Sequence, residues 1–383
     1  MSAHEVVIIG GGIGGLTTAI ALRRRGIEAH VYEAAPQLRA VGAGIWVPTN
    51  AMQVLDRLGL AGAVQAAGRP IEAAELRDAR SGRLQLMDLR QAQQGYGFAT
   101  VAIHRARLQR ILAERVPAAT LHLDRTCTTV EAEGDRVRIR FQDGGQAAAR
   151  VVIGADGVRS AVRRALFPAA RLRYSGQTSY RGVADVRLPS ELEGTGWEVW
   201  GAGCRFGFSA IAEREVYWFA TLGAPPGEME AEGDIQVRLQ PLFASFPSPI
   251  PGILTATPPA RITRTDMYDL APISTWHRGR IALLGDAAHA TTPNLGQGGA
   301  QAIEDAYVIA EQLAAHDQPE EAFRAYERIR VAKAHLVVKR SRQMGRIVHL
   351  SNPLTRGLRN VLLRATPASV TRKQMDALYS LDY

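Results

Sequence analysis

A run of glycines near the start of the chain could hold a phosphate. Gly10, Gly12 and Gly15 have the spacing G-x-G-x-x-G, with Ile13 and Gly14 in the same loop, between an apolar run and a helix-forming segment. The first glycine permits a tight turn, the second lets the backbone approach a pyrophosphate, and the third lets helix and strand pack closely. Free N–H groups at the helix start favour the phosphate charge. The motif predicts a dinucleotide site.

An acidic residue follows at the position that such a site requires. Glu33 and Ala34 come after a second short apolar run, at about the 20-residue spacing of the dinucleotide fingerprint. A carboxylate at this position hydrogen-bonds the ribose hydroxyls of an adenine dinucleotide. The alternative is a solvated carboxylate at a strand end. We favour the first interpretation because strand, glycines, helix and acid occur in the expected order.

Two further motifs place polar residues directly after apolar runs. Asp156 and Gly157 follow the segment 151–153, and taken alone they are typical of an ordinary Asp-Gly turn. Asp286 follows the segment 280–285, and its carboxylate can accept hydrogen bonds from a polyol chain. Asp286 is therefore a candidate contact for the sugar-like part of a bound cofactor.

A second glycine-rich helix start follows Asp286. It contains Leu295, Gly296, Gly298 and Gly299. Backbone amides at a helix N-terminus can hold a developing negative charge. A reduced flavin is an anion at its N1–C2=O edge, so this segment would suit a flavin.

In this order and spacing, the three motifs closely resemble those of the class A flavoprotein aromatic hydroxylases. The most specific part is GRIALLGDAAHATTPNLGQGGAQAIEDA, which is close to a family consensus, and the resemblance covers essentially the whole chain. Within the family the chain is most similar to alkyl-quinolone 3-monooxygenases and urate hydroxylases. The segments SGQTSYRGVADV, EVWGAGCRFGF and VYWFATL resemble the former, and the match around Arg205 is shared by both.

The resemblance implies where each part of an extended FAD would bind. The adenosine would lie at the first glycine loop, and Arg105 matches the family arginine that supports the FAD phosphates. Asp286 would contact the ribityl-pyrophosphate region, and Leu295 to Gly299 would receive the isoalloxazine N1–O2 edge. Asp156 and Gly157 belong to a motif implicated in both FAD and nicotinamide contacts. A separate Rossmann unit for NADH or NADPH is not expected, in agreement with the single fingerprint.

The reaction implied by the resemblance is hydroxylation of a small aromatic or N-heteroaromatic molecule with NADH or NADPH and O₂, through a hydroperoxide at flavin C4a. The protein would hold the ring, exclude water and help to ionise the substrate. No metal is expected, and we interpret His289 as a packing residue. The alternatives are an FAD-dependent reductase or dehydrogenase of the same fold, without oxygen insertion, and a flavoprotein with no catalytic role.

Candidate substrate contacts are less specific. Pro293, in the loop expected over the flavin, would shape the oxygen pocket. Arg205 could pair with an anionic or enolic substrate, or be a solvated arginine of a sheet. Tyr217 could supply a hydroxyl, or simply pack. Three aromatic residues could form walls, although core packing is the stronger expectation for each: Trp46, Trp200 and Phe219. We find no convincing histidine base in this layer.

The elements that must position these residues predict an α/β fold. We expect a Rossmann-like FAD-binding domain of the glutathione-reductase type, with an inserted mixed β-sheet substrate domain and C-terminal helices. The FAD-binding parts are 1–72, 101–173 and 275–383, the last with the C-terminal helices, and the substrate-domain parts are 73–100 and the β-rich 174–274. Segment 39–68 is expected to be a loop that contains one helix from about Asn50 to Leu58.

Composition limits the other possibilities. The net charge is +9, lysine occurs only at positions 333, 339 and 373, and 46% of residues are hydrophobic. We interpret the basic charge as arginine scattered over a solvated surface rather than as a nucleic-acid site. No apolar run reaches the ~20 residues of a membrane span, and the two cysteines share no motif, so a cytoplasmic protein is expected.

Segment 354–363 is both basic and apolar. It could dock to a membrane that supplies a lipophilic quinolone or quinone, or it could be a helix packed on the FAD-binding domain. We favour the second interpretation. The sequence does not distinguish a monomer from a dimer.

Overall fold

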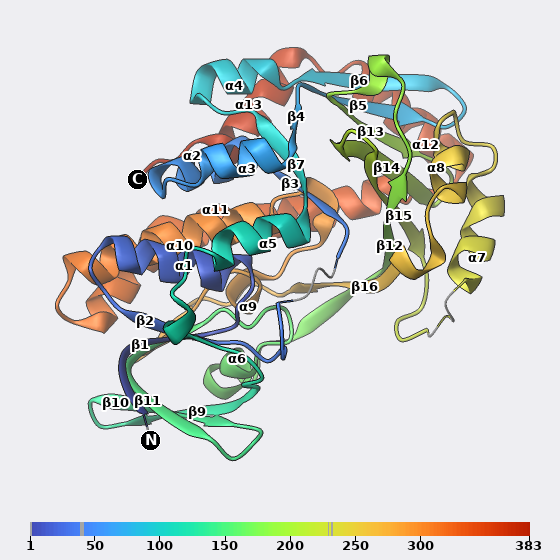
Figure 1. The fold of residues 1–383 in the computed structure, drawn as a ribbon. Coiled ribbons are helices and arrows are strands. Elements are labelled where there is room, and N and C mark those ends of the chain that lie inside the picture. Colours follow the sequence, from blue (N-terminus) through green and yellow to red (C-terminus); the bar gives the residue numbers. More distant parts are fainter. Residues whose placement is uncertain (1, 39–41, 229, 231–232) are drawn as a thin grey trace.

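The computed structural model describes residues 2–38, 42–228, 230 and 233–383. Within these ranges the strands form three sheets, of eight, seven and three strands. In Figure 1 the eight-stranded sheet lies below helices α1 (Ile13–Arg24) and α10 (Gly298–Ala315), and the seven-stranded sheet stands to one side. The fold is α/β, as predicted.

The eight-stranded sheet is built on a buried parallel centre. Strand β1 (Ser2–Ile9) pairs in parallel with β2 (Ala29–Tyr32) on one side and with β11 (Gln146–Gly154) on the other. The second half of β1, from Val6 to Ile9, is a continuous apolar run that is buried on both faces, as is typical of a central parallel strand. The other strands are β8 (Leu121–His122), β9 (Cys127–Glu133), β10 (Arg136–Phe141), β17 (His277–Arg278) and β18 (Ile281–Leu283).

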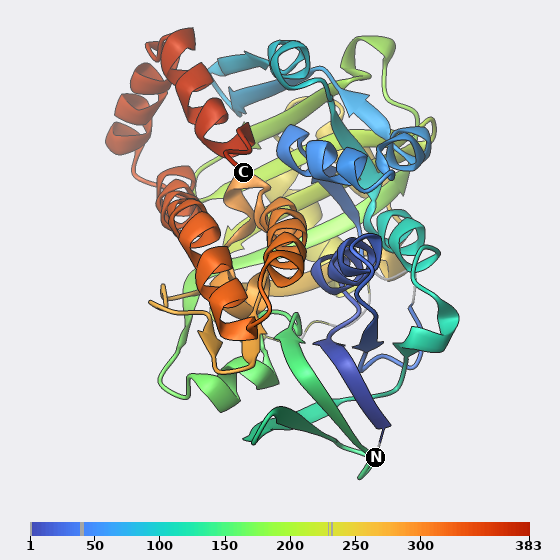
Figure 2. The ribbon, with the colours of Figure 1, turned by 90° about the vertical axis from the view of Figure 1, so that its left-hand side faces the viewer.

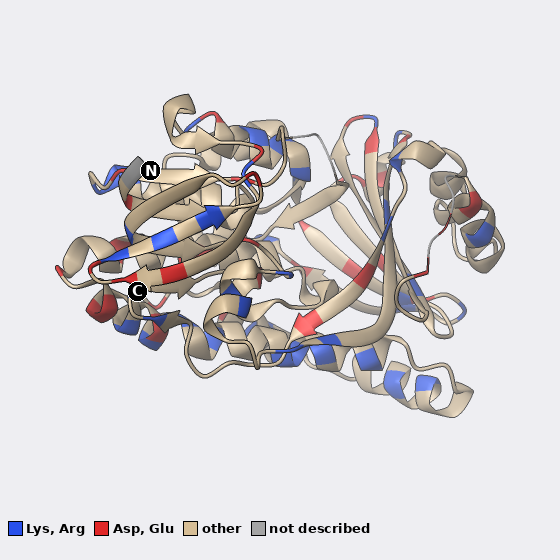
Figure 3. Ribbon diagram, turned by 90° about the horizontal axis from the view of Figure 1, so that it is seen from below, with Lys and Arg blue, Asp and Glu red and all other residues tan. Residues whose placement is uncertain are grey.

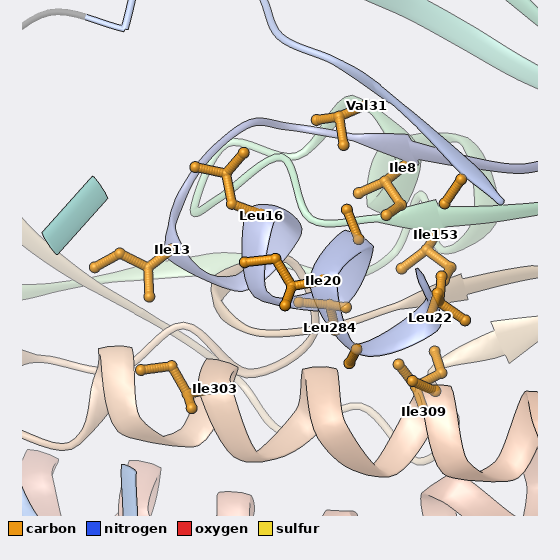
Figure 4. Packing of buried hydrophobic residues seen from close by; sticks show 14 of the residues in the cluster. Ile8, Ile13, Leu16, Ile20, Leu22, Val31, Ile153, Leu284, Ile303 and Ile309 are labelled. Carbon is orange, nitrogen blue, oxygen red and sulfur yellow. The ribbon is translucent and has the colours of Figure 1, made fainter. Parts of the chain in front are cut away.

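Close helix packing covers this sheet. A Cβ added at Gly14 of α1 would lie 2.9 Å from Leu284 Cδ1 and 3.2 Å from Ala302 Cβ, so the glycine lets α1 and α10 pack more closely than a larger residue would. Figure 4 shows the apolar core between the strands and both helices, in which Ile8, Leu16 and Ile303 take part. This packing holds the two glycine-rich helix starts in one rigid unit.

The seven-stranded sheet forms a second layer. Its order is β16-β12-β15-β14-β13-β5-β6, and it is mixed because β13 pairs in parallel with β5 while the other pairs are antiparallel. Helices α7 (Asp234–Phe243) and α8 (Ile250–Thr255) supply apolar residues to its core. The strands are β5 (Ala73–Asp78), β6 (Gly82–Asp88), β12 (Leu172–Asp185), β13 (Thr195–Trp200), β14 (Cys204–Ala212), β15 (Glu215–Gly223) and β16 (Thr263–Leu270).

A small third sheet corrects the prediction for segment 39–68. Strand β3 (Gly44–Val47) lies in what was expected to be loop, and it pairs with β7 (Thr100–His104), which also pairs with β4 (Arg69–Ile71). Helix α2 (Thr49–Arg57) agrees with the predicted helix, but α3 (Ala61–Ala67) was not expected. Four-residue strands of this kind form only through distant pairing. Residues 39–41 of the predicted loop lie outside the described ranges.

The remaining helices connect and cover the sheets. They are α4 (Arg90–Tyr96), α5 (Arg105–Ala113), α6 (Ala161–Leu166), α9 (Asp286–His289), α11 (Pro319–Val348), α12 (Pro353–Arg364) and α13 (Ala368–Tyr379). Figure 2 shows α11 leading from the first sheet to the second, where α12 and α13 lie beside β5 and β6. In the described part of the chain no helix has the length and apolar character to cross a bilayer.

Candidate cofactor and substrate site

The turn from β1 into α1 accepts only glycine at two positions. Gly10 has φ +109°, and a Cβ there would lie 2.4 Å from the carbonyl oxygen of Ala155. A Cβ at Gly15 would lie 1.9 Å from the carbonyl oxygen of Gly10. At Gly12, by contrast, a Cβ would meet no atom within 4 Å. The backbone at Gly12 is therefore open to a ligand, as the second glycine of a phosphate loop must be.

Glu33 lies where β2 ends, beside this turn. Its Oε2 accepts a hydrogen bond of 2.6 Å from the Gly11 N–H, and its Oε1 accepts one of 2.9 Å from the Ala35 N–H. A carboxylate has about four lone-pair directions, so Glu33 keeps the capacity to accept from ribose hydroxyls. The contacts of Glu33 and Ala34 with a ribose remain predictions.

Arg105 and Asp286 are two charged side chains without partners in the part of the chain that the structure describes. Neither forms a side-chain hydrogen bond or ion pair with any described residue. Both reach solvent, yet burial raises the pKa of Asp286, against the effect of His289, Arg105 and Arg163. Burial likewise lowers the pKa of Arg105, against the effect of Asp286. A charged group that is accessible to solvent but largely surrounded by protein is suited to bind a ligand. Arg105 is suited to a phosphate, and Asp286 is suited to hydroxyl groups.

The start of α10 adjoins Asp286. A Cβ at Gly298 would lie 3.9 Å from Asp286 Oδ1, and a Cβ at Gly299 would lie 3.2 Å from Ile45 Cδ1 of β3. Gly296 has φ +63°, which turns the chain from the short helix Pro293–Leu295 into α10. The first turn of α10 contains no acidic residue, so its positive end is available to an anionic group.

Asp156 has a structural role. Its Oδ2 accepts a hydrogen bond of 2.6 Å from the Ala161 N–H, and its Oδ1 accepts from the Ser160 hydroxyl, so it holds the start of α6. Gly157, with φ +75°, forms the turn between them. The predicted FAD and nicotinamide contacts of Asp156 and Gly157 remain predictions.

Two buried groups that support the Asp286 loop were partly missed by sequence reasoning. Arg163 of α6 donates 3.0 Å to the carbonyl oxygen of Ala287, although nothing local in the sequence marks it. His289 lies 2.5 Å from Asp305 Oδ2, which also accepts from the Gly285 N–H. Burial alone would raise the pKa of Asp305, but the charges of His289 and Arg330 lower this pKa to about 2. Through Asp305, His289 and the Gly285 N–H thus fix the loop that contains Asp286.

Tyr217 of β15 faces the other side of the site. A Cβ at Gly44 of β3 would lie 2.3 Å from Tyr217 Cγ, so the base of the Tyr217 side chain packs directly against that strand. No described residue hydrogen-bonds its hydroxyl. Burial raises the pKa of Tyr217, while Arg181 and Arg205 oppose the increase. The charge of Arg181 also lowers the pKa of Arg105. Arg181 is thus a cation that influences both Tyr217 and Arg105, and sequence reasoning did not single it out.

Arg205 is buried, so the alternative of a solvated sheet arginine is wrong. Its Nη1 donates 2.9 Å to Glu198 Oε1, its Nη2 donates 2.5 Å to Asn294 Oδ1, and its Nε donates 3.1 Å to Thr221. Its guanidinium carbon lies 5.2 Å from the ring centre of Phe219. Arg205 therefore ties the seven-stranded sheet to the loop of Pro293.

A histidine reaches this layer from outside the β-rich segment. His349, at the end of α11, places Nε2 3.0 Å from Thr221 Oγ1 and Nδ1 2.9 Å from the Gly345 carbonyl oxygen. Because Nδ1 must donate to that carbonyl, Nε2 of the neutral ring accepts from Thr221. Burial lowers the pKa of His349 and so favours this neutral form. The sequence expectation of no histidine here considered only segment 174–274.

The three aromatic residues predicted as possible walls of the substrate site differ in burial. Trp200 is a core residue: it is buried, and it packs with Leu76, Leu84 and Val348. Trp46 is half-buried in the same cluster as Tyr217, and its Nε1 donates 2.9 Å to Ser209 Oγ. Trp46 and Phe219 thus remain candidates for substrate contact.

Comparison with known proteins identifies this arrangement. A family model described as an FAD binding domain matches residues 3–341. Aurachin C monooxygenase/isomerase of Stigmatella aurantiaca is 41% identical over 359 residues, which cover 94% of this chain and 93% of that protein. The 2-heptyl-3-hydroxy-4(1H)-quinolone synthase of Pseudomonas aeruginosa is 34% identical, with 98% and 97% covered.

A solved structure shares the whole fold. Klebsiella pneumoniae HpxO in complex with FAD and uric acid has a TM-score of 0.90 and is 29% identical, with 98% of this chain and 96% of that chain covered. The fit therefore includes both sheets and the C-terminal helices rather than the glycine motifs alone.

Proposed function

The chain belongs to the family of the FAD binding domain and is a flavin-dependent monooxygenase, and we propose that it uses NADH or NADPH and O₂ to hydroxylate a small N-heteroaromatic ring of the quinolone type. The single observation that carries the flavin site of this proposal is that Arg105 and Asp286, beside the open start of α10, have no side-chain partner among the described residues. One of these relatives, the 2-heptyl-3-hydroxy-4(1H)-quinolone synthase, is named for a quinolone, which supports this ring class.

The described residues fit FAD. The open backbone at Gly12 and the start of α1 would hold the pyrophosphate, with Arg105 as its cation, and Glu33 would accept from the ribose. Asp286 would accept from the ribityl hydroxyls, and the segment Leu295 to Gly299 would receive the N1–O2 edge. When bound, FAD supplies the oxygen-transfer chemistry, and the protein supplies position and electrostatics.

Three side chains would act on the substrate. The raised pKa of Tyr217 keeps its phenol protonated at neutral pH, so it would donate a hydrogen bond to a ring oxygen rather than take a proton. Arg205, held by Glu198 and Asn294, would stabilise negative charge on an ionised ring through its remaining N–H groups. Pro293 would shape the wall beside the reacting ring.

Substrate-stimulated oxidation of the nicotinamide tests the proposal. The holoenzyme is assayed with a panel of 4-quinolones, urate, salicylates and hydroxybenzoates, and hydrogen peroxide is measured beside the product. We expect a 4-quinolone to accelerate NADH or NADPH oxidation with little peroxide release. Stimulation only by single-ring benzoates would contradict the ring class, and turnover of a panel member without oxygen would favour a reductase.

A further inference from the structure

The C-terminal helices have a charge distribution unlike the rest of the chain. Between positions 328 and 375 there are twelve Lys and Arg residues and no Asp or Glu, although the net charge of the whole chain is only +9. All three lysines lie in this stretch. In Figure 3 the helices along the lower edge carry blue residues along their length. The interpretation of the basic charge as scattered arginine therefore does not describe this segment, where Lys and Arg are concentrated without acidic residues.

Helix α12 turns its apolar face toward solvent. Arg359 and Asn360 on one side are only 5% and 7% exposed. A surface helix of a globular protein has the reverse orientation, with its apolar stripe on the core. The outward face has the i, i+4, i+7, i+8 spacing, and its side chains are 60–84% exposed: Leu354, Leu358, Val361 and Leu362.

Polar contacts fix this orientation. Arg356 and Arg359 lie 3.2 and 3.5 Å from Asp78 Oδ2, at the end of β5. Arg359 also donates 3.2 Å to the Val348 carbonyl oxygen and lies 4.8 Å from the Trp200 ring centre. The prediction that this helix packs on the FAD-binding domain is wrong, because its polar face packs on the seven-stranded sheet. Rotating the apolar face inward would break a buried ion pair, which is strongly unfavourable.

We propose that the exposed face of α12 docks the enzyme on the surface of a bilayer that contains anionic phospholipid. The four apolar side chains enter the boundary between headgroups and acyl chains. Exposed Arg346, in the last turn of α11, contacts the lipid phosphates, and so does exposed Arg364, in the last turn of α12, through the N–H groups that it does not donate to Ser81 and Arg83. The contact is peripheral, and it does not depend on which ring the enzyme hydroxylates.

Charge selects a lipid surface over a second copy of this chain. Two copies that met through α12 would bring two acid-free, basic segments together, and like charges at close range repel. An anionic bilayer is complementary to both features at once, since it accepts apolar side chains and attracts the surrounding arginines and lysines.

Cosedimentation of the holoenzyme with vesicles tests the proposal. Wild type is mixed with vesicles of phosphatidylcholine alone, or with about one third phosphatidylglycerol. We expect binding to the anionic vesicles that weakens with added salt. The variant L354Q/L358Q should bind at least tenfold and up to about a hundredfold more weakly, because full burial of each of the two leucines is worth about one tenfold step. R346Q/R364Q should lose affinity for the anionic vesicles.

The matched control removes apolar surface elsewhere. V237Q/L242Q on α7 replaces side chains that are 71% and 46% exposed and should bind vesicles like wild type. Glutamine suits a helix almost as well as leucine. Circular dichroism and basal nicotinamide oxidation should therefore not change in L354Q/L358Q or in V237Q/L242Q.

Two results would overturn the proposal. One is equal vesicle binding, or none, by wild type and L354Q/L358Q. The other is concentration-dependent dimerisation in light scattering that L354Q/L358Q abolishes while vesicles bind neither protein, which would assign the face to a second copy.

Discussion

The two sides of the site differ in whether their charged groups are paired within the protein. On the side of the eight-stranded sheet, Arg105 and Asp286 are open to solvent and have no partner among the described residues. On the side of the seven-stranded sheet, Arg205 is buried and held by Glu198, Asn294 and Thr221. Unpaired groups gain their partners from a ligand, whereas a paired group is already positioned before the ligand arrives. We therefore expect variants on the first side to alter cofactor binding and variants on the second to alter folding and turnover.

The largest expected effect is in the first glycine loop. G15A places a Cβ 1.9 Å from the Gly10 carbonyl oxygen, so we expect little folded holoenzyme. G12A enters open space and should fold but retain FAD poorly, because the methyl group blocks the pyrophosphate. Circular dichroism and the ratio of flavin to protein absorbance separate the two outcomes. Full flavin content in G12A would contradict the phosphate role of this position.

The second effect concerns the paired arginine. R205A leaves Glu198 and Asn294 without their partner and should destabilise folding by about 3 kcal/mol, with loss of substrate-stimulated turnover. The control R214A, in the turn between β14 and β15, removes an exposed pair with Asp185 and should change stability by less than about 0.5 kcal/mol. Urea unfolding of both variants measures this difference. An R205A protein as stable as R214A would show that Arg205 is not held by its contacts.

The third effect concerns the unpaired carboxylate. D286N should weaken FAD binding by roughly tenfold or more, since a charged hydrogen-bond acceptor is lost. Because the folded-state pKa of Asp286 is raised, its ionisation opposes folding, and the penalty appears as pH rises through that pKa. The D286N apoprotein should therefore be at least as stable as wild type at neutral pH. Fluorescence titration with FAD and apoprotein melting curves test both points, and a less stable apoprotein would contradict this description.

The smallest effect concerns the free phenol. Y217F should lower kcat/KM by about fivefold to tenfold, the value of one hydrogen bond, with unchanged FAD affinity. The control Y268F changes a tyrosine of the same sheet whose ring packs at a tilt against Tyr174 and should leave kcat/KM unchanged. Equal kinetics of Y217F and wild type would exclude a hydroxyl contact with the substrate.

The local motifs of the first half could be predicted from sequence. The turn at Gly10 to Gly15, Glu33 at the end of β2 and the glycine-rich start of α10 are each set by neighbours within a few residues, so their residue types reveal them. His289, which the sequence led us to interpret as a packing residue, is buried and bonded to Asp305, sixteen positions further along the chain. Arg163 could not be found, because its role depends on α6 lying against a loop far along the chain.

The second half was less predictable because its contacts are long-range. The burial of Arg205 depends on Asn294, and the histidine of this layer comes from the end of α11. The strand at Gly44 exists only through pairing with β7, and the outward face of α12 follows from Asp78 on β5. Periodicity detects an amphipathic helix but not which of its faces meets the protein.

Transfer of oxygen from O₂ to a ring tests the central claim most directly. The holoenzyme is incubated with NADH or NADPH, a 4-quinolone and ¹⁸O₂, and the product is weighed by mass spectrometry. We predict a product that carries one ¹⁸O atom in a new hydroxyl group, in near-equal amount to the nicotinamide consumed. A product formed without the label, or nicotinamide consumption that yields only peroxide with every ring tested, would contradict the account.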